Sequence, residues 1–124
     1  MGPEKSFENK VKNYLSEQGI YPLGIEEQKI TTKPIGYWEK RFANRYTKSG
    51  LPDMHVCILG YSIEIELKQQ GGKPSDLQIK ICHQINNSGG FAIILYPSGF
   101  DDFKKFVEGL KHETFTRDMP LILK

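Results

Sequence analysis

The chain has 124 residues, of which 17 are basic and 15 acidic, so its formal net charge is only +2. That length suits one domain, residues 1–124, and excludes a second domain of ordinary size. No apolar run is long enough to cross a membrane, residues 1–18 are charged throughout, and Cys57 and Cys82 lack the Cys/His spacing of a zinc site. We therefore expect a cytoplasmic protein without a signal peptide, a membrane partner or structural zinc.

The first predicted helix carries an acidic residue beside its apolar stripe. Phe7, Val11, Tyr14 and Leu15 recur at helical spacing, which predicts an amphipathic helix with this stripe buried. Glu8 falls near Leu15 on the helical wheel, at the edge of the stripe. It can point into a cleft or complement the helix dipole in the first turn, and the sequence leaves both interpretations open.

Basic residues are concentrated in the segment that follows. Residues 29–48 contain six basic side chains and one acidic, interleaved with aromatic residues. Exposed aromatic rings can stack on unpaired bases, but we expect Trp38 and Phe42 to lie in the core. Basic side chains that lead directly into the Pro52-Asp53 segment are suited to contact phosphates. The candidates for such contacts are Lys40, Arg41, Arg45, Lys48 and, further along the chain, Lys73.

Two strands are predicted between Asp53 and Lys68. Residues 54–59 are rich in apolar β-formers, and residues 62–68 alternate strictly between apolar and polar side chains. We expect a hairpin between these strands, with its turn at Gly60-Tyr61. That turn places Asp53 opposite Lys68.

Charged side chains would share one face of this hairpin, namely Glu64, Glu66 and Lys68. Glu66 would be a diagonal neighbour of Asp53, roughly 5–8 Å away. A hard cation can bind to two carboxylates at that distance, and an adjacent ammonium can stabilise negative charge on a phosphate. The alternative is that the charged residues are the solvated face of an amphipathic strand.

A helix and a buried strand are predicted after the hairpin. Ser75 can cap the helix, and Gln78, three residues on, would complete a capping box. In a second interpretation, Gln78 reaches back toward the metal site or the scissile phosphate. Gly89-Gly90 ends the helix, and residues 91–96 are suited to a fully buried strand. A strand–helix–strand passage predicts a right-handed crossover and a parallel strand pair.

The C-terminal part completes the expected fold. Residues 100–110 carry Phe, Val and Leu at helical spacing and should cover one face of the sheet. The apolar run 119–123 should be buried as an edge strand or in a subunit interface. We predict an α/β fold with a mixed central sheet of about four or five strands flanked by helices, a core over residues 5–110 and a tail over residues 111–124.

Several motifs occur in a fixed order along the chain: Tyr46-Thr47-Lys48-Ser49-Gly50-Leu51-Pro52-Asp53, Gly60, Ile65-Glu66-Leu67-Lys68, Gly72-Lys73-Pro74-Ser75, Leu77-Gln78 and Ser88-Gly89-Gly90. Together they resemble the VRR-NUC family of virus-type replication-repair nucleases, within the PD-(D/E)xK superfamily. The match extends from the first helix to about Leu110. It is strongest to the compact stand-alone members encoded by bacteriophages and prophages.

The resemblance implies a role for each matching residue. Asp53 and Glu66 would be metal-binding carboxylates, and the main-chain carbonyl of Leu67 would be a further ligand. Lys68 would be the catalytic lysine, and Gln78 the glutamine that extends the motif. Glu8 is the candidate for an additional acidic residue from the first helix, at the catalytic centre and on the metal. The metal would be Mg²⁺ or Mn²⁺.

The resemblance also implies an activity. Stand-alone relatives act on branched DNA, so we expect a homodimeric, metal-dependent endonuclease that cuts four-way junctions, located in the host cytoplasm if it is phage-encoded. One alternative is a DNA-structure-binding module that does not cut, or that needs a partner to do so. Another is an interaction protein that reuses the fold.

Overall fold

The computed structural model describes residues 2–42, 49–114 and 121–124, and within these ranges six strands form one mixed sheet in the order β1-β2-β3-β4-β5-β6. The strands are β1 (Ile20–Pro22), β2 (Gly36–Lys40), β3 (Met54–Ile58), β4 (Tyr61–Leu67), β5 (Phe91–Leu95) and β6 (Ile122–Leu123). The helices are α1 (Pro3–Glu17), α2 (Asp76–Asn87) and α3 (Phe100–Lys111), with 3-10 turns at Glu27–Lys29 and Pro97–Gly99.

The predicted α/β class is confirmed, but the predicted number of strands is wrong. The sheet has six strands in the described part of the chain, against the expected four or five. β1 has three residues and β6 has two, so neither is long enough to show an alternating pattern in the sequence. β4 and β5 pair in parallel around α2, as the predicted crossover requires.

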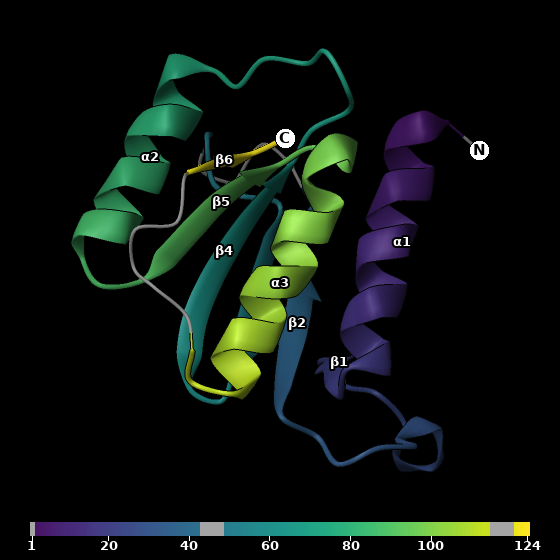
Figure 1. Ribbon diagram of the computed structural model, residues 1–124. Coiled ribbons are helices and arrows are strands. Elements are labelled where there is room, and N and C mark those ends of the chain that lie inside the picture. The colour runs from purple at the N-terminus through teal and green to yellow at the C-terminus, as the bar shows by residue number, and fades with distance from the viewer. Residues whose placement is uncertain (1, 43–48, 115–120) are drawn as a thin grey trace.

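Helices cover both faces of the sheet. α1 and α3 lie side by side on one face, and α2 lies on the other (Figure 1). Aromatic rings of α1 and α3 are in contact: the Phe7 and Phe100 rings meet edge to face, with 6.1 Å between their centroids. The pleat of β4 sends Ile63, Ile65 and Leu67 into the core beneath these helices. Glu64 and Glu66 therefore face the α2 side of the sheet.

The hairpin between β3 and β4 turns one residue earlier than predicted. Ile58 pairs with Tyr61, and the two loop residues Leu59 and Gly60 have φ values of +48° and +88°. Two positive φ values are typical of a type I′ turn, which accepts glycine at its second position. The prediction placed the glycine first, as a type II′ turn would require.

This correction changes what lies opposite Asp53. Met54 pairs with Ile65, so one further step along the register sets Asp53 opposite Glu66 and not opposite Lys68. The shift is two residues along β4, an even number, and each side chain keeps its predicted face. The two carboxylates are consequently closer partners in the sheet than the sequence indicated.

The ends of the sheet test three further expectations. Trp38 packs against the core as predicted, but Phe42 is 74% exposed because it lies beyond the end of β2. Ile122–Leu123 forms an edge strand beside β5, which is one of the two expected arrangements for the tail. Residues 115–120 lie outside the described residues.

None of the helices in the described ranges has both the length and the apolar character needed to span a bilayer.

Candidate active site

The candidate residues lie at the end of the sheet where β3 begins and β4 stops. Asp53 immediately precedes β3, and Glu66 and Lys68 flank the last residue of β4. Figure 1 shows that α1, α2 and α3 also begin at this end. Helix N-termini carry partial positive charge, so the fold surrounds two carboxylates with groups that favour anions.

Asp53 and Glu66 are held by neighbouring donors. The Asp53 Oδ2 atom accepts a hydrogen bond of 2.8 Å from the main-chain N–H of Leu67. The Glu66 Oε1 atom accepts one of 3.3 Å from the Gln78 side-chain amide. Glu66 is only 4% exposed, and its Oε2 atom is buried without a hydrogen-bond donor among the described residues. A buried carboxylate oxygen without a donor is unfavourable unless a proton or a cation occupies the place beside it.

The pKa of Glu66 reflects this arrangement. It is raised from 4.5 to about 8, chiefly by burial and also by the charge of Asp53 and a hydrogen bond to that carboxyl, against the opposing effect of Lys68 and Lys40. A hydrogen bond between two carboxyl groups requires a proton on one of them. At neutral pH the metal-free site therefore favours one shared proton over two negative charges.

Lys68 supplies a cation beside this pair. Its main-chain N–H bonds to Leu95 O at 3.0 Å, which fixes the chain just past the end of β4. Its half-buried side chain forms no ion pair with any residue that the structure describes. The ammonium is close enough to lower the pKa of Glu66. It is thus available to an incoming anion.

Gln78 forms the predicted capping box and also contacts Glu66. Its Oε1 atom accepts a hydrogen bond of 2.8 Å from the main-chain N–H of Ser75. The main-chain N–H of Gln78 donates to Ser75 Oγ at 3.1 Å, so the capping box is present. The amide nitrogen at the other end of the same group donates to Glu66. One side chain therefore fixes the start of α2 and holds the buried carboxylate.

Glu8 lies near the site but does not join the pair. Its carboxylate forms ion pairs with Lys5 and Lys12 at 2.8 Å and with Lys40 at 3.6 Å. Burial raises its pKa, but these lysines outweigh burial and lower it to about 2. The Lys40 ammonium is also 3.7 Å from Asp53 Oδ1, so it stands between the two acids.

The predicted phosphate-binding residues have different surroundings. Lys73 is exposed in the loop before α2. Arg41 is paired with Glu64 at 2.6 Å, and Lys40 is only 17% exposed between Glu8 and Asp53. Arg45 and Lys48 lie outside the described residues.

Glu64 and His55 form a contact that the sequence analysis did not predict. Glu64 was predicted only to share the charged face of β4, yet it is 8% exposed. Its two oxygens contact Arg41 Nη2 and, at 2.5 Å, His55 Nδ1. The signal available in the sequence was an arginine just after one strand, a histidine in the next strand and an acid in the third, but pairing them required the correct register.

The donor set at the Asp53–Glu66 pair fits a hard divalent cation. Mg²⁺ and Mn²⁺ take oxygen ligands, and the pair offers two carboxylates, one with a buried oxygen that lacks a donor. The N–H of Leu67 points to the Asp53 side of β4, and in a strand the carbonyl of the same residue points that way too. Among the described residues, no three His, Cys, Asp or Glu side chains are grouped as a metal site.

Comparison of the chain with family models, with curated proteins and with solved structures gives no match in any of the three. The resemblance to the VRR-NUC family thus depends on the motif residues.

Proposed function

We propose that the protein is a Mg²⁺- or Mn²⁺-dependent DNA endonuclease that hydrolyses phosphodiester bonds at the Asp53–Glu66 pair. The observation that carries the proposal is the buried Glu66 carboxylate, which faces Asp53 and has one oxygen without a donor among the described residues. A folded protein tolerates such an arrangement when a cation or proton completes it. The resemblance to the VRR-NUC family supports the same assignment.

Asp53, Glu66 and the Leu67 carbonyl would hold the metal, whose chemistry is to polarise the phosphate and to lower the pKa of a bound water. The Leu67 N–H would hold the Asp53 carboxylate in place through its bond to Oδ2, and the Gln78 amide would do the same for Glu66 through Oε1. Lys68 would hold its ammonium against the scissile phosphate and stabilise the negative charge that builds up there.

DNA would approach the end of the sheet that bears these residues. Lys73 is exposed there, and Lys40 lies beside Asp53. Arg45 and Lys48 remain candidates from the sequence. Such side chains attract the phosphate backbone without reading its sequence.

A branched substrate and a homodimer follow from the resemblance alone. Two active sites related by a twofold axis would suit paired cuts in a four-way junction. Multi-angle light scattering at micromolar concentration should give twice the monomer mass of 14.2 kDa. A monomer mass would remove the dimer from the proposal while leaving the catalytic site untouched.

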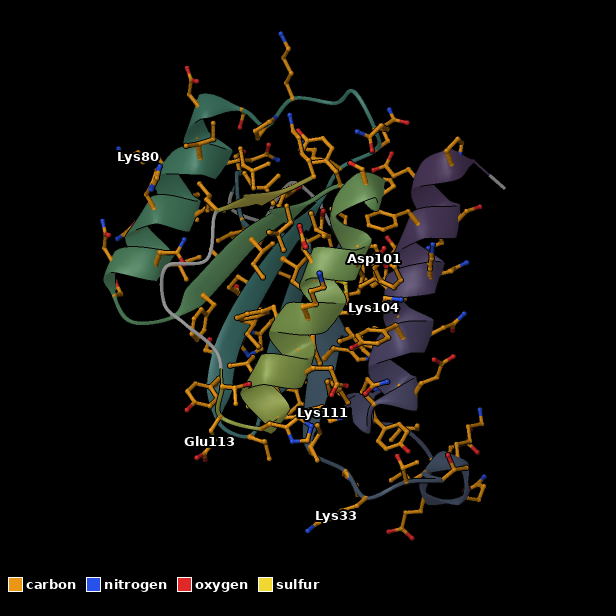
Figure 2. All side chains as sticks on the ribbon, viewed as in Figure 1. Lys33, Lys80, Asp101, Lys104, Lys111 and Glu113 are labelled. Carbon is orange, nitrogen blue, oxygen red and sulfur yellow. The ribbon has the colours of Figure 1, made fainter. Side chains whose placement is uncertain are left out.

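The decisive experiment compares end-labelled four-way junction, flap and linear duplex DNA, each with Mg²⁺, Mn²⁺ or EDTA. We expect metal-dependent cutting that prefers the junction. Lys68→Ala should lower the rate by at least about 10²-fold without loss of DNA binding. Lys80→Ala is the matched control, because Lys80 is exposed and projects from the outer side of α2, away from the sheet (Figure 2).

Equal cutting by Lys68→Ala and the wild type would exclude Lys68 from the mechanism. Tight junction binding with no cutting under any metal would instead favour the DNA-structure-binding module. Absence of DNA binding would favour the interaction protein.

A further inference from the structure

The Pro52-Asp53 segment is hydrogen-bonded to Arg41, the residue that follows β2. The main-chain N–H of Arg41 donates to Asp53 O at 2.7 Å, and the Arg41 Nη1 atom donates to Pro52 O at 3.0 Å. The main chain on either side of the Asp53 α-carbon therefore bonds to the same arginine. Asp53 lies one step beyond the last paired residue of β3, where the main-chain bond from Arg41 continues the β2–β3 register and the Nη1 bond to Pro52 O adds a side-chain contact.

Arg41 is in turn fixed by a buried acid. Its Nη2 atom lies 2.6 Å from Glu64 Oε1, and Glu64 Oε2 lies 2.5 Å from His55 Nδ1. The side chain of Glu64 is 10% exposed and that of Arg41 is 32% exposed, so water screens this pair only in part. Each Glu64 oxygen therefore already has a partner in the protein.

The guanidinium is suited to this double task. Its planar fork presents several donors in fixed directions, so one group can contact a carboxylate and a carbonyl at once. A lysine ammonium at the same place keeps the charge but loses the fixed geometry. The side chain of Arg41 is thus engaged in contacts within the protein, unlike that of an exposed DNA-binding residue.

We propose that Arg41 and Glu64 are positioning residues, which hold Asp53 where it can meet Glu66 across the metal. The metal in this inference rests on the proposed function. The position of Asp53 does not depend on that function. It also gives Arg41 a role other than the phosphate contact predicted from the sequence. Glu64 acts through Arg41, and neither residue touches the substrate.

The first test needs no metal. The amide proton of Leu67 is protected by its bond to Asp53 Oδ2, so its exchange rate reports where Asp53 is held. We expect Arg41→Lys and Glu64→Gln to speed this exchange about tenfold in the metal-free protein. Val107→Ala is the control, because Val107 is fully buried in α3 and its truncation weakens the core without touching the site.

The second test measures metal and DNA separately in the same variants. Both should weaken Mn²⁺ binding by at least about tenfold by calorimetry, as substitution of the partners of metal ligands commonly does. Junction affinity in EDTA should stay within about twofold of the wild type. Val107→Ala should keep wild-type values for both, provided that all proteins are measured at a temperature where circular dichroism shows them folded.

The outcomes separate the two proposals. Unchanged Leu67 exchange in both variants would overturn the positioning role. Weaker DNA binding with unchanged exchange would return Arg41 to the phosphate contacts. Faster exchange in a protein that binds no Mn²⁺ even as wild type would uphold the positioning role and overturn the proposed nuclease.

Discussion

Glu64 and Glu66 are two residues apart on the same face of β4, and both are buried, yet their surroundings are opposite. Glu64 has a partner for each oxygen, in Arg41 and His55. Glu66 faces another acid, Asp53, and its Oε2 atom has no donor in the described part of the chain. A satisfied buried charge is explained by the fold, whereas an unsatisfied one requires a further explanation.

The pKa of Glu66 is strongly shifted. It is raised to about 8 by burial and by the negative charge of Asp53. Groups with strongly shifted pKa values in one cluster are typical of functional sites. The comparison supports a structural role for Glu64 and, on the proposed function, a role for Glu66 at the reactive site, and variants of these two residues test that difference.

The largest expected effect is on metal-dependent cleavage. Glu66→Gln removes one of the two acidic ligands and should abolish cutting, whereas Glu64→Gln should slow it about tenfold through the altered position of Asp53. Single-turnover rates in saturating Mn²⁺, with Lys80→Ala as the control, measure both. Equal losses in the two glutamine variants would contradict the contrast.

Stability should change in opposite directions in the same two variants. Glu64→Gln leaves Arg41 without its carboxylate and should lower the free energy of unfolding by about 2 kcal/mol, a modest value because the arginine can still be hydrated. Glu66→Gln relieves the repulsion with Asp53 and should raise the free energy of unfolding of the metal-free protein at pH 8. Urea titrations in EDTA measure both, and a loss of stability in each variant would show that Glu66 is a structural charge.

The pH dependence of stability should come from Glu66. Its pKa rises from 4.5 in the unfolded chain to about 8 in the fold, so between these values the folded state holds a proton that the unfolded state has lost. The free energy of unfolding of the metal-free protein therefore falls as pH rises from 4.5 to 8, by at most about 1.4 kcal/mol per pH unit from this group.

Substitution separates this contribution from others. Glu66→Gln should flatten the decline between pH 5 and pH 8, and Glu64→Gln should retain it. Chemical denaturation at several pH values in EDTA provides the measurement. A decline of equal slope in wild type and Glu66→Gln would assign the titration to another group.

Much of the fold followed from the sequence because its signals are local. The strict alternation of residues 62–68 predicted which side chains of β4 face the core, and the capping signal at Ser75 and Gln78 predicted where α2 begins. Very short strands such as β1 and β6 give no periodic signal, and their pairing depends on the rest of the sheet. That is why the two edge strands of the sheet were not counted in the prediction.

The candidate site was predicted in its members but not in its geometry. The types and spacing of Asp53, Glu66 and Lys68 identified them, whereas their relative positions depended on a single turn. Moving the turn to Leu59-Gly60 set Asp53 opposite Glu66. The ion pair between Arg41 and Glu64 joins two strands that are not neighbours in the sheet, so no pattern within one strand could indicate it.

Gln78 offers the smallest but most specific test, because its two roles can be separated. Gln78→Ala loses the capping box and the bond to Glu66, so it should lower stability by about 1 kcal/mol and slow cleavage. Gln78→Glu keeps an acceptor for Ser75 N but has no amide to donate to Glu66. In saturating Mn²⁺ it should recover the stability lost in Gln78→Ala while cleavage stays about tenfold below the wild type. Recovery of both would show that Gln78 serves only to start α2, and that Glu66 needs no donor to work.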